Sequence, residues 1–169
     1  NPAIKIGISD IDFDTTCSEL VGKTEFLALG LNNTGGHGTR VATLAAGKTD
    51  NGGGLASIGF NCSLVVTTKG YDGILDAVYR GAKVVNCSWG SPTAVNATYD
   101  YSNPVIDLVT SLGVTVVASA GNWYIPPGQY FFPASYNNVI SVSSVGHIND
   151  IGEKNNYCWK DVHDGRPLL

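Results

Sequence analysis

The sequence predicts an α/β fold of three layers, in which one central, mostly parallel sheet carries helices on both faces. Short apolar runs bounded by turn residues alternate along the chain with segments of helical pattern. This alternation is typical of parallel strands that are joined by crossover helices. With 169 residues, of which 43% are hydrophobic, the chain is long enough for one buried core and too short for several domains.

Six apolar runs are predicted to be the strands of this sheet. Residues that favour turns bound each run, and 21 glycines in the chain indicate frequent turns and close backbone approaches. The predicted strands are residues 4–9, 26–29, 64–68, 83–87, 114–119 and 139–145.

Three helices are predicted between these strands. Residues 38–46 end at Gly47, which suits a C′ position, and residues 71–80 end before Gly81. The third helix has the clearest limits, because an asparagine can cap its first turn, a proline fits its first helical position and a glycine stops it. These three residues are Asn103, Pro104 and Gly113, and the residues that share one face between them are Val105, Val109 and Leu112.

The acidic balance of the chain excludes some classes of partner. A formal net charge of -4 and a pI near 5.1 argue against nucleic acid and against anionic membranes, since both require a concentrated basic surface. The ten Lys and Arg residues are scattered. No apolar run reaches the roughly 20 residues that a membrane span requires.

Both ends of the sequence favour a piece of a longer chain. Asn1 begins a segment with neither an initiator Met nor a signal-peptide pattern. Periodicity fades from Gly146 onward, and residues 161–169 show neither a strand nor a helix pattern. We therefore expect residues 1–169 to form one partial domain.

Four cysteines occur without the CxxC spacing of zinc or thioredoxin-type sites: Cys17, Cys62, Cys87 and Cys158. Buried free thiols and one or two disulfides both remain open. Cys87 lies within the predicted strand 83–87, where packing favours a small hydrophobic residue.

A first polar cluster follows the first predicted strand. Asp10 stands at the carboxyl end of that strand, which is the edge where open parallel sheets gather functional side chains. Asp12 and Asp14 follow it. Taken alone, an acidic turn of this kind is more often a solvated or helix-capping cluster than a site.

A second cluster surrounds His37, at the start of the predicted helix 38–46. Glycines on both sides of this residue allow the backbone to approach a neighbouring strand, so that His37 can sit rigidly above the sheet edge. The same segment partly fits a dinucleotide-binding GxGxxG pattern. That alternative fails because no strand precedes the segment and no acid ends the next strand.

A third cluster ends at Asn122, just after the predicted strand 114–119. An isolated asparagine there is usually a turn residue, but its amide can equally be an oxyanion donor. Together, in this order, the three clusters resemble the subtilase family of serine proteases. The segments that match the family's motifs are Asp10 with Phe13, Glu19 and Leu20; HGTRVA at residues 37–42; residues 51–64; NCSWG at 86–90; ASAGN at 118–122; and FPA at 132–134 with residues 139–145.

The resemblance implies a three-layer subtilisin-like fold and a serine endopeptidase with an Asp-His-Ser triad. In that mechanism His37 is the base, Asp10 orients its imidazole, and the Asn122 amide donates to the developing oxyanion. An extended peptide would be held through main-chain hydrogen bonds. The residues implied in substrate binding are Ser88, Trp89, Gly90, Ala118, Ser119, Ala120 and Gly121.

The serine of the family is not found in the sequence. The family order is Asp, His, Ser, and nothing after Asn122 reads Gly-Thr-Ser. The later serines that lack the glycine context of a nucleophile are Ser135, Ser141, Ser143 and Ser144. These 169 residues alone are therefore predicted to be inactive. Two hypotheses stay open: an active secreted endopeptidase whose serine lies outside these residues, and a catalytically dead module that keeps the peptide groove.

The chain departs from the family's pattern at several positions. Asp12 replaces a glycine, Cys17 and Ser18 replace His-Pro, and Trp89 stands where an aliphatic residue is common. The segment 68–71 is short where other members have a specificity loop. The resemblance is therefore a weak guide to the substrate pockets.

The resemblance also implies a structural calcium ion, although the chemistry itself requires no cofactor. Glu19 matches a ligand position of the family, and Asp50 and Asn51 begin a loop whose carbonyl and amide oxygens are hard ligands that calcium prefers. An ordinary glycine-rich loop is the alternative. The expected partners are a peptide or protein substrate and a pro-segment inhibitor, and the expected location is secreted or in the cell envelope.

Two structural expectations follow from the resemblance. The Asp10 carboxylate should lie within about 3.5 Å of a His37 ring nitrogen. The helix that follows the family's serine would be missing, so apolar surface should be exposed at Val116, Ile140 and Val142 or their neighbours. We therefore expect residues 1–169 alone to be poorly soluble or partly unfolded.

Overall fold

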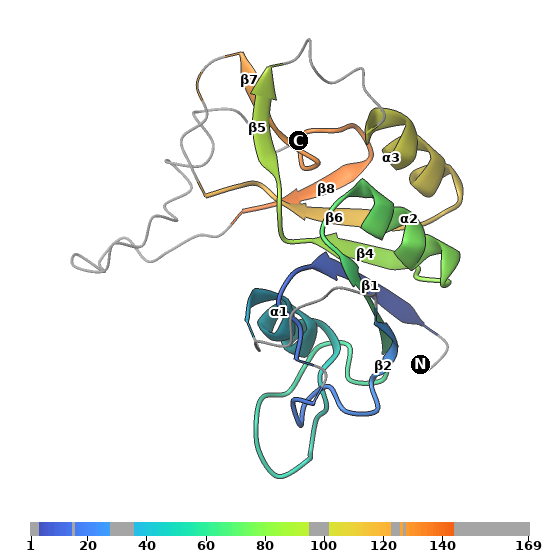
Figure 1. Cartoon of the computed structure of the whole chain (residues 1–169), viewed down its shortest axis with the longest axis vertical. Coiled ribbons are helices and arrows are strands. Elements are labelled where there is room, and N and C mark those ends of the chain that lie inside the picture. The colour runs from blue at the N-terminus through green and yellow to red at the C-terminus, as the bar shows by residue number, and fades with distance from the viewer. Residues whose placement is uncertain are drawn as a thin grey trace, which may run out of the picture.

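The computed structural model describes residues 4–14, 16–27, 36–94, 102–122, 126 and 128–143. Its elements are β1 (Lys5–Asp10), β2 (Thr24–Leu27), α1 (His37–Ala46), β3 (Ser63–Thr68), α2 (Tyr71–Tyr79), β4 (Val84–Cys87), β5 (Ser91–Ala94), α3 (Ser102–Ser111), β6 (Thr115–Ser119), β7 (Gln129–Phe132) and β8 (Val139–Val142). Figure 1 shows their arrangement. The six predicted strands and three predicted helices are all present, with slightly different ends. The predictions for residues 28–29, Ser144, residue 145, Cys158 and the tail 161–169 lie outside the described residues.

One six-stranded sheet forms the centre of the fold, in the order β2-β3-β1-β4-β6-β8. All of its neighbouring strands pair in parallel. The carboxyl ends of β1, β4 and β6 therefore meet at one edge, where polar side chains can gather. Strands β5 and β7 form a separate antiparallel pair that the sequence did not predict.

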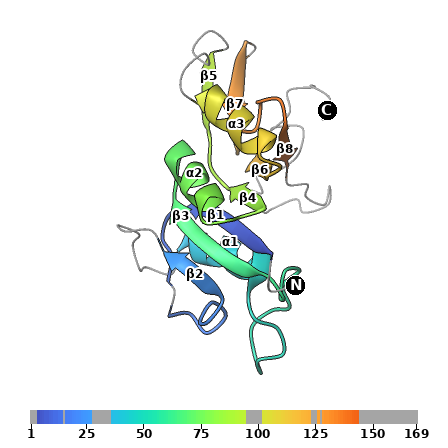
Figure 2. The ribbon, with the colours of Figure 1, turned by 90° about the vertical axis from the view of Figure 1, so that its right-hand side faces the viewer.

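Helices cover both faces of the sheet, which confirms the predicted three layers. On β3, Leu64 and Val66 belong to a core cluster with α1, whereas Val65 belongs to a second cluster with α2 and α3. This alternation follows from the period of two along a strand. In Figure 2, α2 and α3 lie in front of the sheet and α1 lies behind it.

The α1 face of the sheet is covered over only part of its width. Among the described residues, β8 exposes Ile140 and Val142 on this face, with 54% and 51% of their surface accessible, and Leu44 on α1 is 60% exposed beside them. The expectation of exposed apolar surface is confirmed for these two β8 residues. It is wrong for Val116, which is fully buried against the other face.

The third helix differs from its prediction in two details. It begins at Ser102, so that Pro104 is its third residue and Asn103 bonds Asp107 one turn later in place of capping. Ile106 is fully buried, whereas Leu112 is 60% exposed beyond the helix end. The helix therefore packs through Val105, Ile106 and Val109.

The predicted glycine stops have different physical reasons. Gly81 and Gly113 have φ of 90° and 77°, the left-handed conformation that favours glycine at a helix end. Gly47 does follow the last residue of α1, but it is extended, with φ of -60° and ψ of 166°, and not left-handed. A Cβ at Gly47 would instead lie 2.7 Å from the Thr43 carbonyl oxygen.

The described cysteines are free thiols: Cys17, Cys62 and Cys87. Cys87 is fully buried in the cluster under α2 and α3, as its place in an apolar strand predicted. Burial raises the pKa of its thiol, and the nearby Asp10 charge adds to the effect. Cys87 therefore acts as a small hydrophobic residue.

Candidate active site

Asp10 and His37 form a close pair at the carboxyl edge of the sheet. His37 Nδ1 lies 2.9 Å from each carboxylate oxygen of Asp10, which confirms the predicted proximity. The Asp10 side chain is 2% exposed and the His37 side chain 54% exposed. Among the described residues no other side chain bonds the ring, so Nε2 is left available to a reacting group.

The loop after β1 holds the start of α1 in place. Gly38 N–H donates to the Ile11 carbonyl oxygen at 2.8 Å, and Thr39 Oγ1 donates to the Asp12 carbonyl oxygen at 3.1 Å. The same hydroxyl accepts a 2.7 Å hydrogen bond from the Asp14 N–H. These bonds fix the first turn of α1 against the residues that follow Asp10.

Burial dominates the electrostatics of Asp10. Loss of solvent raises the pKa of this carboxyl above its ordinary value of 3.8, against the opposing effects of the Ile11 N–H and His37. The Ile11 N–H donates to Asp10 Oδ1 at 2.8 Å. Because one oxygen is held by the backbone and both face His37, the carboxylate has little freedom to turn.

The other two acids of the cluster have backbone roles. Asp12 has φ of 57°, in the left-handed region that aspartate tolerates better than most residues, which accounts for a glycine at this position in the resembled family. Asp14 Oδ1 accepts hydrogen bonds from the N–H and hydroxyl of Thr16 at 2.9 and 2.6 Å. These bonds lower the pKa of Asp14, and they make it a turn residue.

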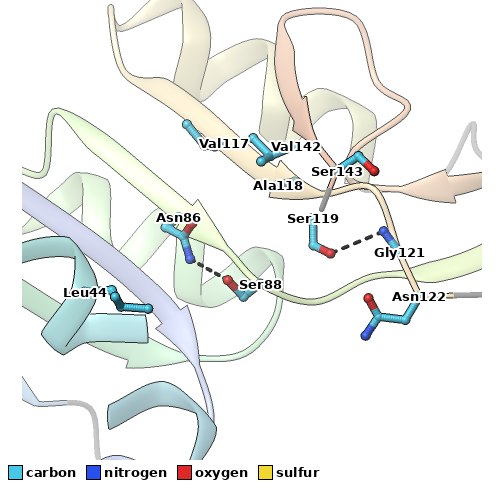
Figure 3. Close-up of a pocket in the computed structure, with 10 residues that line it drawn as sticks. All are labelled: Leu44, Asn86, Ser88, Val117, Ala118, Ser119, Gly121, Asn122, Val142 and Ser143. Atoms are coloured by element: carbon cyan, nitrogen blue, oxygen red, sulfur yellow. Dashed lines mark hydrogen bonds between the residues drawn. The ribbon is translucent and has the colours of Figure 1, made fainter. Parts of the chain in front are cut away.

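A cavity of about 560 Å³ opens over the ends of β4 and β6. Figure 3 shows its lining, with Leu44 at one side and Asn122 near the other. The Asn86 amide donates to Ser88 Oγ at 2.9 Å, and Gly121 N–H donates to Ser119 Oγ at 3.2 Å. The residues that line it are Leu44, Asn86, Ser88, Val117, Ala118, Ser119, Gly121, Asn122, Val142 and Ser143.

The structure brings most residues of the predicted peptide-binding set to this edge. Ser88, Trp89 and Gly90 continue β4, Ala118 and Ser119 end β6, and Ala120, Gly121 and Asn122 follow them. Three of these residues do not line the cavity: Trp89, Gly90 and Ala120. Trp89 packs against the α2 side and its indole N–H donates to Ser9 Oγ at 3.1 Å, and Ala120 is 6% exposed.

The predicted calcium ligands lie apart from this edge. Glu19 is 8% exposed, and its Oε1 accepts a 3.0 Å hydrogen bond from the Asn51 amide. Its Oε2 is buried with no partner among the described residues. Gly54 packs so closely that a Cβ there would lie 2.8 Å from Oε2. Asp50 is exposed, so the contacts centre on the Glu19 carboxylate.

Sequence reasoning missed one residue that shapes this edge. Phe131, on β7, is 4% exposed and lies against both Gly90 and Gly121. Its position depends on the pairing of β5 with β7, for which the sequence carries no strong alternation. The sequence signal that could have indicated a close contact at this edge is the pair of glycines at positions 90 and 121.

Comparisons with known proteins identify the family of the chain. The model of the subtilase family matches residues 4–163. The chain belongs to the subtilase family. A thermophilic serine proteinase of Bacillus sp. (strain AK1) is 31% identical over 94% of this chain and 42% of its own length. A major intracellular serine protease of Bacillus subtilis is 28% identical over 90% and 54%, and a halolysin-like extracellular serine protease of Natrialba magadii is 36% identical over 64% and 21%.

Solved structures share the fold. The prenylagaramide maturation protease superposes with a TM-score of 0.74 at 22% identity over 86% of this chain and 55% of its own. Fervidolysin from Fervidobacterium pennivorans, described as a keratinolytic enzyme related to subtilisin, gives 0.69 at 26% identity over 86% and 25%. This subtilase chain spans about half or less of the length of these relatives. No helix in the described part of the chain is long and apolar enough to cross a membrane.

Proposed function

We propose that this chain carries the Asp-His part and the peptide-binding part of a subtilisin-type serine endopeptidase. The observation that carries the proposal is the 2.9 Å contact between His37 Nδ1 and the buried Asp10 carboxylate. A carboxylate on Nδ1 holds the tautomer in which Nε2 can accept a proton, and it stabilises the imidazolium that then forms. A solvated surface pair would not require this burial.

His37 would act as the general base, with Nε2 accepting the proton of a serine hydroxyl that attacks the peptide carbonyl. Asp10 would stay in place as the orienting group. The Asn122 amide, beside the cavity at the end of β6, would donate a hydrogen bond to the oxyanion. In this class of site, such a donor contributes roughly 2.7–4 kcal/mol to transition-state stabilisation.

The nucleophile would come from polypeptide outside these residues. Three serines line the cavity beside β4 and β6. Ser88 Oγ and Ser119 Oγ accept hydrogen bonds from neighbouring groups, and Ser143 lacks the glycine context of a nucleophile. On the α1 side of the sheet, β8 leaves Ile140 and Val142 exposed, and a further helix could pack over them. The greater length of the relatives is consistent with this source.

Labelling with a serine-directed phosphonylating reagent tests the proposal. The longer natural chain should be labelled at one serine in a Gly-Thr-Ser context, and His37→Ala should prevent the labelling, because only an activated hydroxyl reacts. Residues 1–169 alone should stay unlabelled. A natural chain that binds peptides yet is never labelled would favour the dead peptide-binding module.

We also propose that Glu19 holds a structural calcium ion. A buried carboxylate oxygen without a partner is unfavourable, and a cation beside Glu19 Oε2 would satisfy it. The Asn51 amide now presents its nitrogen to Glu19, and a half-turn of the amide would present its oxygen. The ion would stabilise the loop and take no part in the chemistry. No group of three or more His, Cys, Asp and Glu suited to a metal is found among the described residues, so backbone carbonyl oxygens would complete the shell.

The remaining proposals concern substrates and location. A peptide or protein would be the substrate, and a pro-segment would act as an inhibitor before activation. The protein would be secreted or bound in the cell envelope. The extracellular protease of Natrialba magadii supports this location, whereas the relative from Bacillus subtilis is named as intracellular. Fractionating the native host and probing with an antibody to residues 1–169 would test the location.

A further inference from the structure

The ring of Phe131 occupies the space between two glycines at the candidate peptide site. A Cβ on Gly90 would overlap the ring and would lie 2.8 Å from its Cδ1 atom. A Cβ on Gly121 would lie 3.1 Å from Cγ and Cδ2 of the same ring. Since both backbones touch the ring, it fills the gap between them, and only 4% of Phe131 is exposed.

Several contacts hold the ring in this gap. The Phe131 N–H donates to Ser135 Oγ at 3.1 Å, and the Ser135 N–H donates to the Phe131 carbonyl oxygen at 2.9 Å. Phe131 also pairs with Pro92 across the β5–β7 ladder, and its side chain belongs to the core cluster under α2 and α3. A ring fixed on its backbone and packed in a core does not swing aside at low cost.

The gap lies between the two segments that would hold a peptide. Gly90 follows β4 and Gly121 follows β6, and these strands are neighbours with Cys87 opposite Ala118. A peptide chain bonded to both segments would direct one side chain down between the two glycines. This step rests on the proposed function, because it takes the two segments as the peptide site.

We propose that Phe131 sets the specificity of the site by closing this gap, so that the substrate residue on the acyl side of the cleaved bond must be small, glycine or alanine. Leucine or phenylalanine at that position would have to displace a buried ring. A single methylene that a pocket cannot accommodate already changes kcat/KM by about 10–200-fold. We therefore expect at least a 100-fold preference for alanine over phenylalanine.

The test compares four peptides that differ only in that residue, as Gly, Ala, Leu or Phe, with the full natural chain as enzyme. Phe131→Ala should raise the ratio of kcat/KM for the Phe peptide to that for the Ala peptide by about 100-fold. The ratio is independent of how much of the variant is folded, since both rates scale with the same active fraction. Phe132→Ala is the matched control, because this neighbour packs against Tyr130 and Tyr136, and it should leave the ratio unchanged.

Each result bears on the inference separately from the proposed function. If the wild type cleaves after phenylalanine as fast as after alanine, the inference is overturned and the endopeptidase proposal is unaffected. The same holds if Phe131→Ala has the same ratio of kcat/KM for the Phe peptide to that for the Ala peptide as the wild type. If no peptide is cleaved, the endopeptidase proposal fails. Calorimetric binding of product peptides that end in Ala or Phe then decides: at least 10-fold tighter binding of the Ala peptide supports the closed gap, and equal or absent binding overturns it.

Discussion

The Gly38 amide donates a 2.8 Å hydrogen bond to the Ile11 carbonyl oxygen, and this bond joins the residue after His37 to the residue after Asp10. The contact leaves no room for a side chain at position 38. A Cβ there would overlap the same carbonyl oxygen and would lie 2.8 Å from the Phe13 ring, which is fully buried. The geometry of the pair therefore depends on a glycine.

Gly38→Ala should lower both stability and activity. The added methyl must push α1 away from the loop, and overpacking of this kind costs about 1–3 kcal/mol. Chemical unfolding and peptide hydrolysis measure the two effects. Gly53→Ala is the matched control, because a Cβ at Gly53 meets nothing within 4 Å, and it should leave activity intact. Equal effects of the two substitutions would contradict this account.

Replacement of Asp10 should affect catalysis far more than substrate binding. Asp10→Asn keeps the shape of the side chain but favours the wrong tautomer of His37, so kcat should fall by about 10⁴-fold while KM changes little. Steady-state kinetics on the full natural chain measure both constants. Asp14→Asn is the control, since the Asp14 carboxylate accepts hydrogen bonds from Thr16 within its own turn. An Asp10→Asn variant with nearly full kcat would remove Asp10 from the triad.

The buried carboxyl also predicts a pH dependence of stability. Burial raises the pKa of Asp10 above 3.8, so the folded state binds its proton more tightly than the unfolded state. As pH rises from about 3.8 through the folded pKa, the unfolded chain loses the proton first and the free energy of unfolding falls. Above that window the contribution is constant.

Asp10→Asn cannot titrate and should lack this fall. The difference in unfolding free energy, wild type minus variant, should therefore decrease with rising pH across the window, as urea unfolding at a series of pH values would show. A difference that increases with pH would mean that pairing with His37 outweighs burial.

Calcium should stabilise the protein through Glu19. A ligand that binds only the folded state raises its stability by about 2.7 kcal/mol at 100 times its Kd, so added calcium should raise Tm and a chelator should lower it. Glu19→Gln should abolish this response. Glu25→Gln, which alters an exposed glutamate paired with Lys5, should keep it. If the Tm of the wild type changes with neither calcium nor chelator, Glu19 does not hold a calcium ion.

The sequence predicted elements whose pattern is local and missed those fixed by distant contacts. The strand at residues 64–68 begins with three apolar residues and continues with two β-branched threonines, a composition that favours strands. Asp10 and His37 stand at element ends, so both the strand and the pair could be placed. Strand β5 reads Ser-Pro-Thr-Ala, which carries no alternation, and it forms only because β7 lies beside it. The Phe131 ring was missed for the same reason.

The error at Val116 has a related cause. Strand β6 has apolar residues on both faces, so its pattern cannot tell which face a further layer would cover. The register resolves this, because Val117 lies opposite Ile140 and Ser119 lies opposite Val142. Residues opposite each other in a parallel pair share a face, and Val117, Ile140 and Val142 therefore form the partly uncovered surface on the α1 side.

Because of this uncovered surface, polar substitutions on β8 should benefit residues 1–169 alone and harm a longer natural chain. In residues 1–169 alone, Ile140→Thr with Val142→Thr should raise the soluble yield, since both side chains are about half exposed and exposed apolar patches favour aggregation. In a longer natural chain whose further helix covers the face, the same pair should lower the free energy of unfolding by about 1–3 kcal/mol for each buried hydroxyl. Leu112→Thr, at an exposed position on the other side of the sheet, should be nearly neutral in both. If the pair raised solubility without lowering the stability of the longer chain, no further layer would pack on β8, and the source proposed for the missing serine would be wrong.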